Sequence, residues 1–279
     1  MEKKQEKKII AMSRKFVRAR IRCNELSKWS CIQNKLFSII LSKIDWKNGN
    51  NSNWIELQPD EVFQALGWNV KREEYSRFMN KVKHELEYML KHSAITVDNP
   101  YTKTSTSDNL ITHLQLDNTS FYIVLSQDFM PHFENLYSLA KETKLSFITF
   151  FLAEEMSFKS KFALSLLLEL RSCGSPNGSI ITHSLSTKQL KELFGMGIDD
   201  YTVMDSKTGK KRFDRYKFEK RVLDRAAEEI NKTSMIQLQA AENGRLYQKE
   251  SDSRGRITGY IFRYQLFKLE ENENTFSTD

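Results

Sequence analysis

Apolar residues recur at helical spacing along four segments of the chain, and each segment predicts a helix that buries one side. The first half contains two of these segments, Ser27–Ile44 and Arg72–Lys91. The second half contains the other two, Ser160–Cys173 and Tyr216–Lys232. The stripe of Arg72–Lys91 comprises Tyr75, Phe78, Met79, Val82, Leu86, Met89 and Leu90. The stripe of Tyr216–Lys232 comprises Phe218, Val222, Leu223, Ala226 and Ile230.

Shorter elements stand between these helices. "WIELQPDEVFQALGW" predicts a short strand and then a short helix that begins at Pro59. "SLSTKQLKELFGM" predicts a short helix whose Ser186 and Gln189 fit a capping box. Strand-like segments follow the long helix in each half, namely "AITV", "LITHLQL" and "FYIVLS" in the first and two segments around a polar, basic loop in the second.

Each half therefore follows the order helix, short helix, longer helix and β-hairpin, which is the order of a winged helix. We predict an α+β, helix-rich chain with two tandem winged-helix (helix-turn-helix plus β-wing) domains. The expected divisions are a disordered basic lead at 1–13, an N-terminal domain at 14–140, a C-terminal domain at 141–269 and an acidic tail at 270–279. His132–Lys144 is expected to be a helical connector, followed by Leu145–Leu152 as a strand or buried segment.

Composition narrows the class of protein. The 279 residues carry a net charge of +7, which favours an anionic partner, although a basic protein without one would have the same charge. The three cysteines are odd in number and lack a CxxC pair, so neither a disulfide framework nor a zinc site is favoured. The N-terminus lacks the apolar core of a signal peptide and no apolar run reaches about 18 residues. We expect a cytoplasmic protein without a membrane span.

The helix at Tyr216–Lys232 has an uneven charge distribution. Lys217, Lys220 and Arg221 lie in its first turns, after a basic run that ends at Arg215, and carboxylates follow. This order opposes the helix dipole, which favours acids first, so it points to a functional surface. A recognition helix enters the major groove with its N-terminal residues nearest the bases, where cations find phosphates and guanine acceptors. We therefore predict that Arg215, Lys217, Lys220 and Arg221 contact DNA. A solvated face without a partner is the alternative.

Two further places predict contact with DNA. Arg77, Asn80 and Lys81 lie opposite the apolar stripe of Arg72–Lys91, and arginine and asparagine pair bidentately with guanine and adenine edges. Arg254 and Arg256 flank Gly255 in the second hairpin loop, as at a wing tip that contacts phosphate or the minor groove. A plain solvated helix and a flexible charged loop are the respective alternatives. The segment "SKTGKKR" could add nonspecific phosphate contacts and is expected to be disordered without DNA.

Motifs for enzyme chemistry are missing from the sequence. There is no G-x-x-x-x-G-K-[ST], no G-x-G-x-x-G and no histidine pair at metal-site spacing. Asp60 and "ETK" at 142–144 superficially match a split nuclease motif, but Asp60 suits a helix N-terminus. We therefore expect a protein that is not an enzyme, with no catalytic residue, no cofactor and no metal ligand.

Four runs in the second half carry a resemblance to a known family: "SKFALSLLLELRS", "LSTKQLKELFGM", "YKFEKRVLDRAAEEINKTSMIQL" and "RGRITGYIFRYQL". The chain resembles the initiator Rep proteins of theta-replicating, iteron-containing bacterial plasmids, which have two winged-helix domains. The resemblance covers about Phe16 to Phe267. Its most specific part is RVL-x-x-A-x-x-EIN-x-x-(T/S), and the first half matches mainly in layout.

The resemblance implies a plasmid replication initiator. Such a protein binds repeated origin sequences (iterons) in double-stranded DNA, helps to open an adjacent AT-rich duplex, and recruits host replication proteins. It also implies that the second domain is the main DNA reader, through Lys217, Lys220 and Arg221, and that the first domain contacts DNA and forms the interface of a possible homodimer. Repression of its own gene through an operator inverted repeat is a further implication. The alternatives are a winged-helix transcriptional repressor without a role in initiation and a DNA-cleaving or nicking enzyme.

Overall fold

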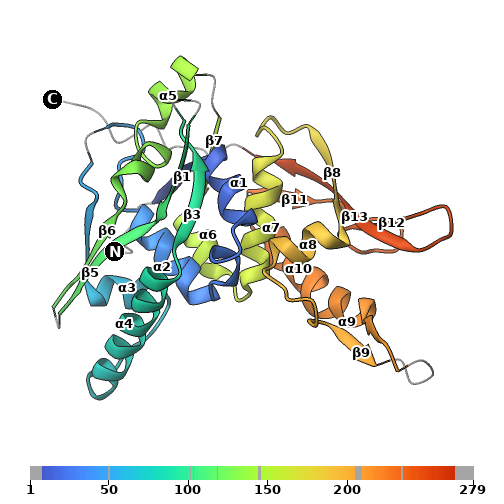
Figure 1. The fold of residues 1–279 in the computed structure, drawn as a ribbon, viewed down its shortest axis with the longest axis horizontal. Helices are drawn as coiled ribbons and strands as arrows, with labels where there is room; N and C mark the ends of the chain where they lie inside the picture. Colours follow the sequence, from blue (N-terminus) through green and yellow to red (C-terminus); the bar gives the residue numbers. More distant parts are fainter. Residues whose placement is uncertain are drawn as a thin grey trace, which may run out of the picture.

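The computed structural model describes residues 8–49, 51–100, 102, 104–117, 119–143, 146–204, 209–233 and 235–267. The two halves of the chain lie side by side, with the first half on the left and the second on the right (Figure 1). Helices α1 (Arg14–Arg22) and α7 (Lys161–Ser172) pack against each other between them. One large apolar cluster draws buried residues from both halves, so the halves share a continuous core.

The first half contains a winged helix. Ser30 caps α2 (Cys31–Leu41) in a capping box with Gln33, and Pro59 occupies the first turn of α3 (Pro59–Ala65). The long helix α4 (Tyr75–Lys91) follows a short 3₁₀ turn, η2 (Arg72–Glu74). Three antiparallel strands in the order β2-β6-β5 complete the unit, namely β2 (Trp54–Leu57), β5 (Ile111–Leu116) and β6 (Phe121–Leu125). A separate hairpin is formed by β3 (Ala94–Asp98) and β4 (Ser105–Asn109).

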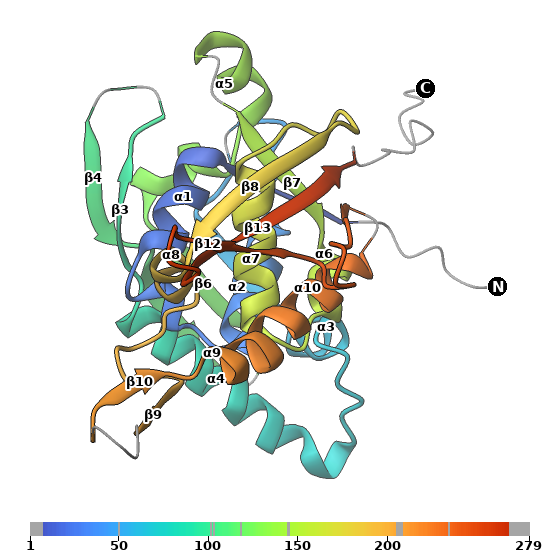
Figure 2. The same ribbon diagram turned by 90° about the vertical axis from the view of Figure 1, so that its right-hand side faces the viewer.

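The second half repeats this plan with additions. After α7 and α8 (Thr187–Leu193), a small hairpin of β9 (Thr202–Met204) and β10 (Lys211–Phe213) precedes the last helix. That helix consists of α9 (Arg215–Phe218), a π-helical turn η4 (Glu219–Leu223) and α10 (Asp224–Asn231). The closing sheet has β13 (Ile257–Leu266) at its centre, flanked by β8 (Ile180–Ser186), β11 (Ile236–Leu238) and β12 (Gln248–Ser251). Figure 2 shows β8 and β13 lying side by side.

The N-terminal strand differs from the sequence prediction. Ile9–Ser13 form β1, which pairs with β7 (Phe147–Phe151), and residues 10–13 are buried, so the predicted disordered lead over 1–13 is wrong for this stretch. The physical reason is that Ile10, Ala11 and Met12 find an apolar partner strand far along the chain. Ser13 then caps α1 by accepting a hydrogen bond from the N–H of Phe16. Residues 1–7 and the predicted tail at 270–279 lie outside the described residues.

The two halves also touch at the turn after α8. Gly195 adopts a φ of 60°, which favours glycine. A Cβ atom at this position would run into the backbone carbonyl of Ser27 in the first half. Only a glycine allows the chain to approach this closely without a shift of one half against the other.

The predicted helical stripes are confirmed. Every apolar residue predicted for Tyr216–Lys232 is buried, and those of Arg72–Lys91 are buried or partly buried in the core. The connector is confirmed as helical by a 3₁₀ segment η3 (Gln127–His132) and α5 (Leu136–Thr143), and "LSFITFFL" contains β7. The predicted boundary at 140/141 falls inside α5 and stays a prediction. The sequence reading did not include α1, β4, α6 (Leu152–Ser157) or β8.

Among the described residues, no helix has the length and apolar character needed to cross a membrane.

Candidate DNA-binding surface

The helix formed by α9, η4 and α10 has one fully buried side and one charged side. Asp214 caps its start by accepting a hydrogen bond from the N–H of Lys217, at 3.1 Å. On the charged side Lys217, Lys220 and Arg221 are all exposed, as the sequence predicted. The ammonium group of Lys220 lies 5.9 Å from the centre of the Tyr216 ring, which is itself 66% exposed. The first two turns thus offer three cations and one aromatic ring to a partner.

A buried carboxylate anchors this helix to the sheet behind it. Glu219 is buried in the π-helical turn, where its Oε2 lies 2.6 Å from Nη1 of Arg245 and 2.8 Å from Nζ of Lys249. The hydroxyl group of Tyr260 donates to its other oxygen, Oε1, at 3.1 Å. These three partners come from the segment before β12, from β12 and from β13. The helix is therefore tied to the wing by charge as well as by apolar contact.

Asp224, one of the carboxylates that follow the cations in this helix, also has a partner behind the helix. The hydroxyl group of Tyr247 donates to its Oδ1 at 2.6 Å. Burial, and then this hydrogen bond, raise the pKa of Tyr247 far above its ordinary value, so the hydroxyl group stays protonated and can donate. The carboxylate of Asp224 is therefore held by Tyr247 and has a structural role.

Arg215 lies between the helix start and the wing. Its Nη2 donates to the backbone carbonyl of Ile257 at 2.8 Å, and the residue is only partly exposed. This contact fixes where β13 begins relative to α9. The predicted contact of Arg215 with DNA stays a prediction.

The hairpin of β9 and β10 adds basic side chains next to the helix. Lys211 and Arg212 are exposed, and Lys211 Nζ lies 2.7 Å from Oδ1 of Asp199. Lys211 and Arg212 of the predicted disordered segment "SKTGKKR" (206–212) instead lie in a strand, because they pair with Met204 and Val203. Residues 206–208 of that segment lie outside the described residues.

The wing tip is a tight turn organised by Asp252. This carboxylate accepts hydrogen bonds from the backbone N–H groups of Arg254 and Arg256 and lies 2.9 Å from Nε of Arg256. The bond from the N–H of Arg256, followed by the others, holds the pKa of Asp252 below its ordinary value. Gly255 has a φ of 71°, as the tip requires. Arg254 and Arg256 are both exposed, so the turn presents two guanidinium groups to solvent.

In the first half, α4 presents a comparable surface. Arg77, Asn80 and Lys81 are exposed, opposite the buried stripe. The ammonium group of Lys81 lies 4.8 Å from the centre of the Trp68 ring, which holds it against the turn between α3 and α4. The N-terminal end of α4 and the end of the second half that carries α9 and the β9–β10 hairpin project at the same side of the molecule, the lower side in Figures 1 and 2. The starts of α4 and α9 thus lie on one side of the protein.

Exposed Arg225 joins this surface although the sequence patterns did not assign it. Arg225 follows Arg221 by four residues, and this spacing puts both on one helical face, so it could have been found. Lys211 and Arg212 were predicted within "SKTGKKR" to add phosphate contacts, and the pairing of β9 with β10 places them beside the helix.

Comparison with known families identifies the chain. Residues 9–171 match the sequence model described as initiator replication protein, WH1, and residues 186–264 match that of initiator Rep protein, WH2. Together the two matches take in most of the chain, and both predicted winged helices are confirmed. The protein is thus a two-domain winged-helix chain, and it belongs to the initiator Rep protein family. The first match runs past the predicted domain boundary at residue 140.

The chain is also similar to solved structures. The Pi initiator protein, in a crystal structure with iteron DNA, is 14% identical, with 95% of this chain and 100% of that chain covered and a TM-score of 0.65. Domains 2 and 3 of RctB give 8% identity, coverage of 86% and 81%, and a TM-score of 0.46. A comparison with curated protein sequences gives no match. The likeness to Pi supports the two-winged-helix fold over nearly the whole chain.

Proposed function

We propose that this protein initiates plasmid replication by binding repeated origin DNA with both winged helices at once. The observation that carries the proposal is the common side on which α4 and α9 present their N-terminal ends (Figure 1). Recognition helices enter the major groove by that end, and one straight duplex can meet two such helices only if both face the same way. The family supports a role in initiation, and the Pi structure was solved with iteron DNA.

The chemistry of the surface suits the proposal. Exposed lysine and arginine side chains at the helix starts supply phosphate contacts, which dominate affinity. Arg77, Asn80 and Arg221 are side-chain types that discriminate bases through two hydrogen bonds. The wing tip of the second domain adds Arg254 and Arg256. Affinity and sequence preference thus have separate sources among the exposed side chains of the protein.

The test is binding to the DNA that flanks the gene. Fluorescence anisotropy with one labelled direct repeat, with a shuffled repeat of the same composition, and with the whole repeat array should give tight binding only to the authentic sequence. Footprinting on the array should protect every repeat, and the strand contacts of each should extend over two successive major grooves. Equal affinity for authentic and shuffled repeats would overturn the proposal.

A transcriptional repressor without a role in initiation is the second candidate. The same surface would serve it, so the DNA target separates the two functions. A repressor would protect a single inverted repeat at a promoter and would leave the direct repeats unprotected. Loss of plasmid maintenance on deletion of the direct repeats, with the promoter intact, would support initiation.

The remaining roles follow from the same proposal. We propose that the protein acts by binding and makes no covalent change in DNA. Cleavage of origin DNA with magnesium, lost in Asp60→Ala, would contradict this.

The first domain would form a homodimer for repression of its own gene through an operator inverted repeat, and the DNA-bound form would recruit host replication proteins in the cytoplasm. Analytical ultracentrifugation with each DNA target tests the first of these, and co-purification on origin DNA tests the second.

A further inference from the structure

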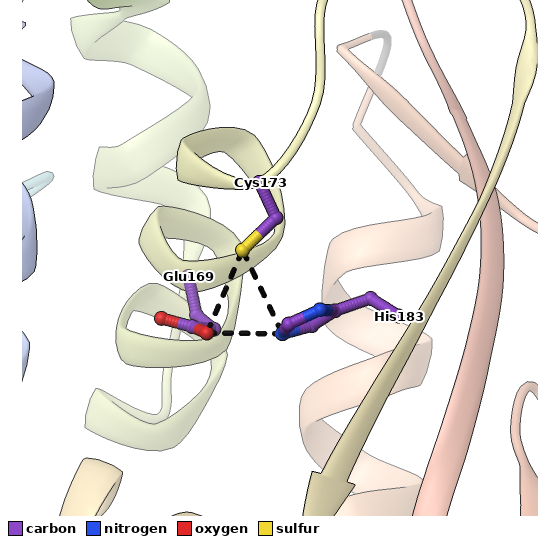
Figure 3. Close-up of side chains that lie close together, drawn as sticks. All are labelled: Glu169, Cys173 and His183. Carbon is purple, nitrogen blue, oxygen red and sulfur yellow. Dashed lines mark hydrogen bonds and ion pairs between the residues drawn. The ribbon is translucent and has the colours of Figure 1, made fainter.

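Three potential metal ligands meet where α7 ends beside β8 (Figure 3). Glu169 and Cys173 lie one turn apart on the last part of α7, and His183 reaches them from β8. Nε2 of His183 lies 3.0 Å from Oε1 of Glu169 and 3.6 Å from Sγ of Cys173, and that sulfur lies 3.7 Å from the same carboxylate oxygen. The three atoms form a compact triangle.

We propose that Glu169, Cys173 and His183 bind a divalent transition metal of the zinc type, with a fourth position open to solvent. Zinc takes carboxylate oxygen, imidazole nitrogen and thiolate sulfur at about 2.0–2.3 Å in tetrahedral geometry, which implies ligand-to-ligand edges of roughly 3.3–3.6 Å. The observed edges of 3.0, 3.6 and 3.7 Å differ from these values by a few tenths of an ångström. A metal ion can therefore enter the triangle with small side-chain movements.

The backbone that carries the ligands is already held in place. Cys173 ends α7, and its N–H donates to the carbonyl group of Leu170. That same carbonyl accepts a 2.7 Å hydrogen bond from the hydroxyl group of Tyr264 in β13. His183 is paired with Phe262 of β13, in the middle of a seven-residue ladder. Both ligand-bearing elements are thus fixed to β13, and the site needs no rearrangement of the chain.

The ligand types select the class of metal. A thiolate and an imidazole favour zinc and its neighbours in the transition series over magnesium and calcium, which prefer oxygen ligands. The side chains of Glu169 and His183 are 15% and 22% exposed, and Cys173 is exposed. The exposed thiol of Cys173 gives an ion access from solvent. Three protein ligands with an open position match the arrangement of exchangeable rather than closed structural zinc sites.

Hydrogen bonds to Cys173 and to Glu169 raise the pKa of His183 to about 9. A metal ion would bind the neutral imidazole and the thiolate form of Cys173, so binding releases protons. The metal would link the end of the core helix α7 to β8, the strand next to β13, whose start forms one arm of the wing.

Cobalt(II) is the probe because a thiolate ligand gives it a charge-transfer band. The full-length protein, freed of metal with a chelator, should bind one cobalt ion per chain with this band and with the visible bands of a tetrahedral site. Zinc should displace the cobalt and should raise Tm. In Cys173→Ser the charge-transfer band should vanish, and in Cys173→Ser and His183→Gln the zinc affinity should fall roughly tenfold or more.

The matched control is Cys23→Ser, which removes a thiol of the first half and should leave the band and the affinity unchanged. Circular dichroism of each metal-free variant verifies folding, and His183→Gln tests the site if Cys173→Ser does not fold. A wild-type protein without the charge-transfer band, or a band that survives in Cys173→Ser or disappears in Cys23→Ser, would refute the site.

Discussion

Nη1 of Arg245 lies 2.6 Å from a carboxylate oxygen of Glu219, inside the helix on which the DNA-binding surface is built. The glutamate side chain is 2% exposed, and it occupies the π-helical turn between α9 and α10. Lys249 shares the same oxygen at 2.8 Å. Glu219 thus neutralises both Arg245 and Lys249. It holds the helix formed by α9, η4 and α10, called the reader helix below, against the sheet.

Glu219→Gln should lower the free energy of unfolding by about 2 kcal/mol. Loss of one partner from a buried ion pair costs about 3–5 kcal/mol when the other charge stays buried. The Arg245 and Lys249 side chains are 30% and 35% exposed and can turn to water, so a smaller loss is expected. Urea unfolding measures the change, and Glu228→Gln, on the exposed side of the same helix, should have no effect. Equal stability of the two variants would contradict the anchoring role.

Arg221→Ala should cost about 1–3 kcal/mol of binding to the authentic repeat and should relax the preference at one base pair. The guanidinium group is exposed in the second turn of the reader helix, where base edges would lie. Lys232→Ala, at the far end of the helix, is the matched control. Anisotropy titrations against single-base variants of the repeat provide the measurement. Unchanged affinity and unchanged preference would remove Arg221 from the set of readers.

Arg254→Ala should weaken binding to all sequences alike. The side chain is exposed at the wing tip, and a phosphate contact there contributes about one unit to the slope of log K against log salt. Titrations at several salt concentrations, with repeat and shuffled DNA, measure the slope. If the variant instead alters the preference at one position, the wing reads a base or the width of the minor groove.

Arg77→Ala should reduce affinity for the repeat by about 1–3 kcal/mol if α4 enters a groove of the same duplex. Lys91→Ala, at the opposite end of α4, should change affinity far less. A footprint of the Arg77 variant should keep the contacts of the second domain and lose those in the neighbouring groove. An intact footprint with full affinity would leave the first domain without a role in DNA contact.

His132 should make the protein less stable in acid. Burial, and then the charge of Lys15, lower the pKa of His132 in the folded state to about 4. In the unfolded state the pKa of a histidine is about 6.5, so below this pH the unfolded state binds a proton that the folded state does not bind until about pH 4. The stability is therefore full above pH 6.5 and falls by about 3 kcal/mol as the pH drops toward 4. Unfolding of wild type and His132→Gln between these pH values should show a shallower decline for the variant, and parallel curves would refute the assignment.

Local patterns were sufficient to predict much of this fold. The capping box of Ser186 and Gln189 and the apolar stripe ending at Ile230 depend only on neighbouring residues, and both are confirmed. By contrast, β1 was missed because its apolar residues are stabilised by a strand more than a hundred residues later. Strand pairing of that kind leaves no local periodicity for a sequence reading to detect.

The candidate DNA-binding surface likewise has residues that the sequence predicts and residues that only the fold brings together. The exposed cations of α4, α9 and the wing tip follow from helical spacing and turn chemistry, so the sequence located them. The burial of Glu219 depends on Arg245 and Lys249, which only the folded sheet brings to it. The meeting of His183 with Cys173 likewise depends on β8, a strand that the polar "SIITHS" segment did not predict.

The π-helical turn has a geometric consequence for what precedes it. An α-helix advances by about 100° per residue, and a π turn spends one residue more than an α turn. Glu219–Leu223 therefore sets the angular phase of Arg215–Phe218 relative to α10. A regular α-helix over the same residues would place Lys217 about 100° further around the axis relative to α10. The direction in which Arg215–Phe218 presents its side chains thus depends on the backbone of the π-helical turn as well as on the side chains themselves.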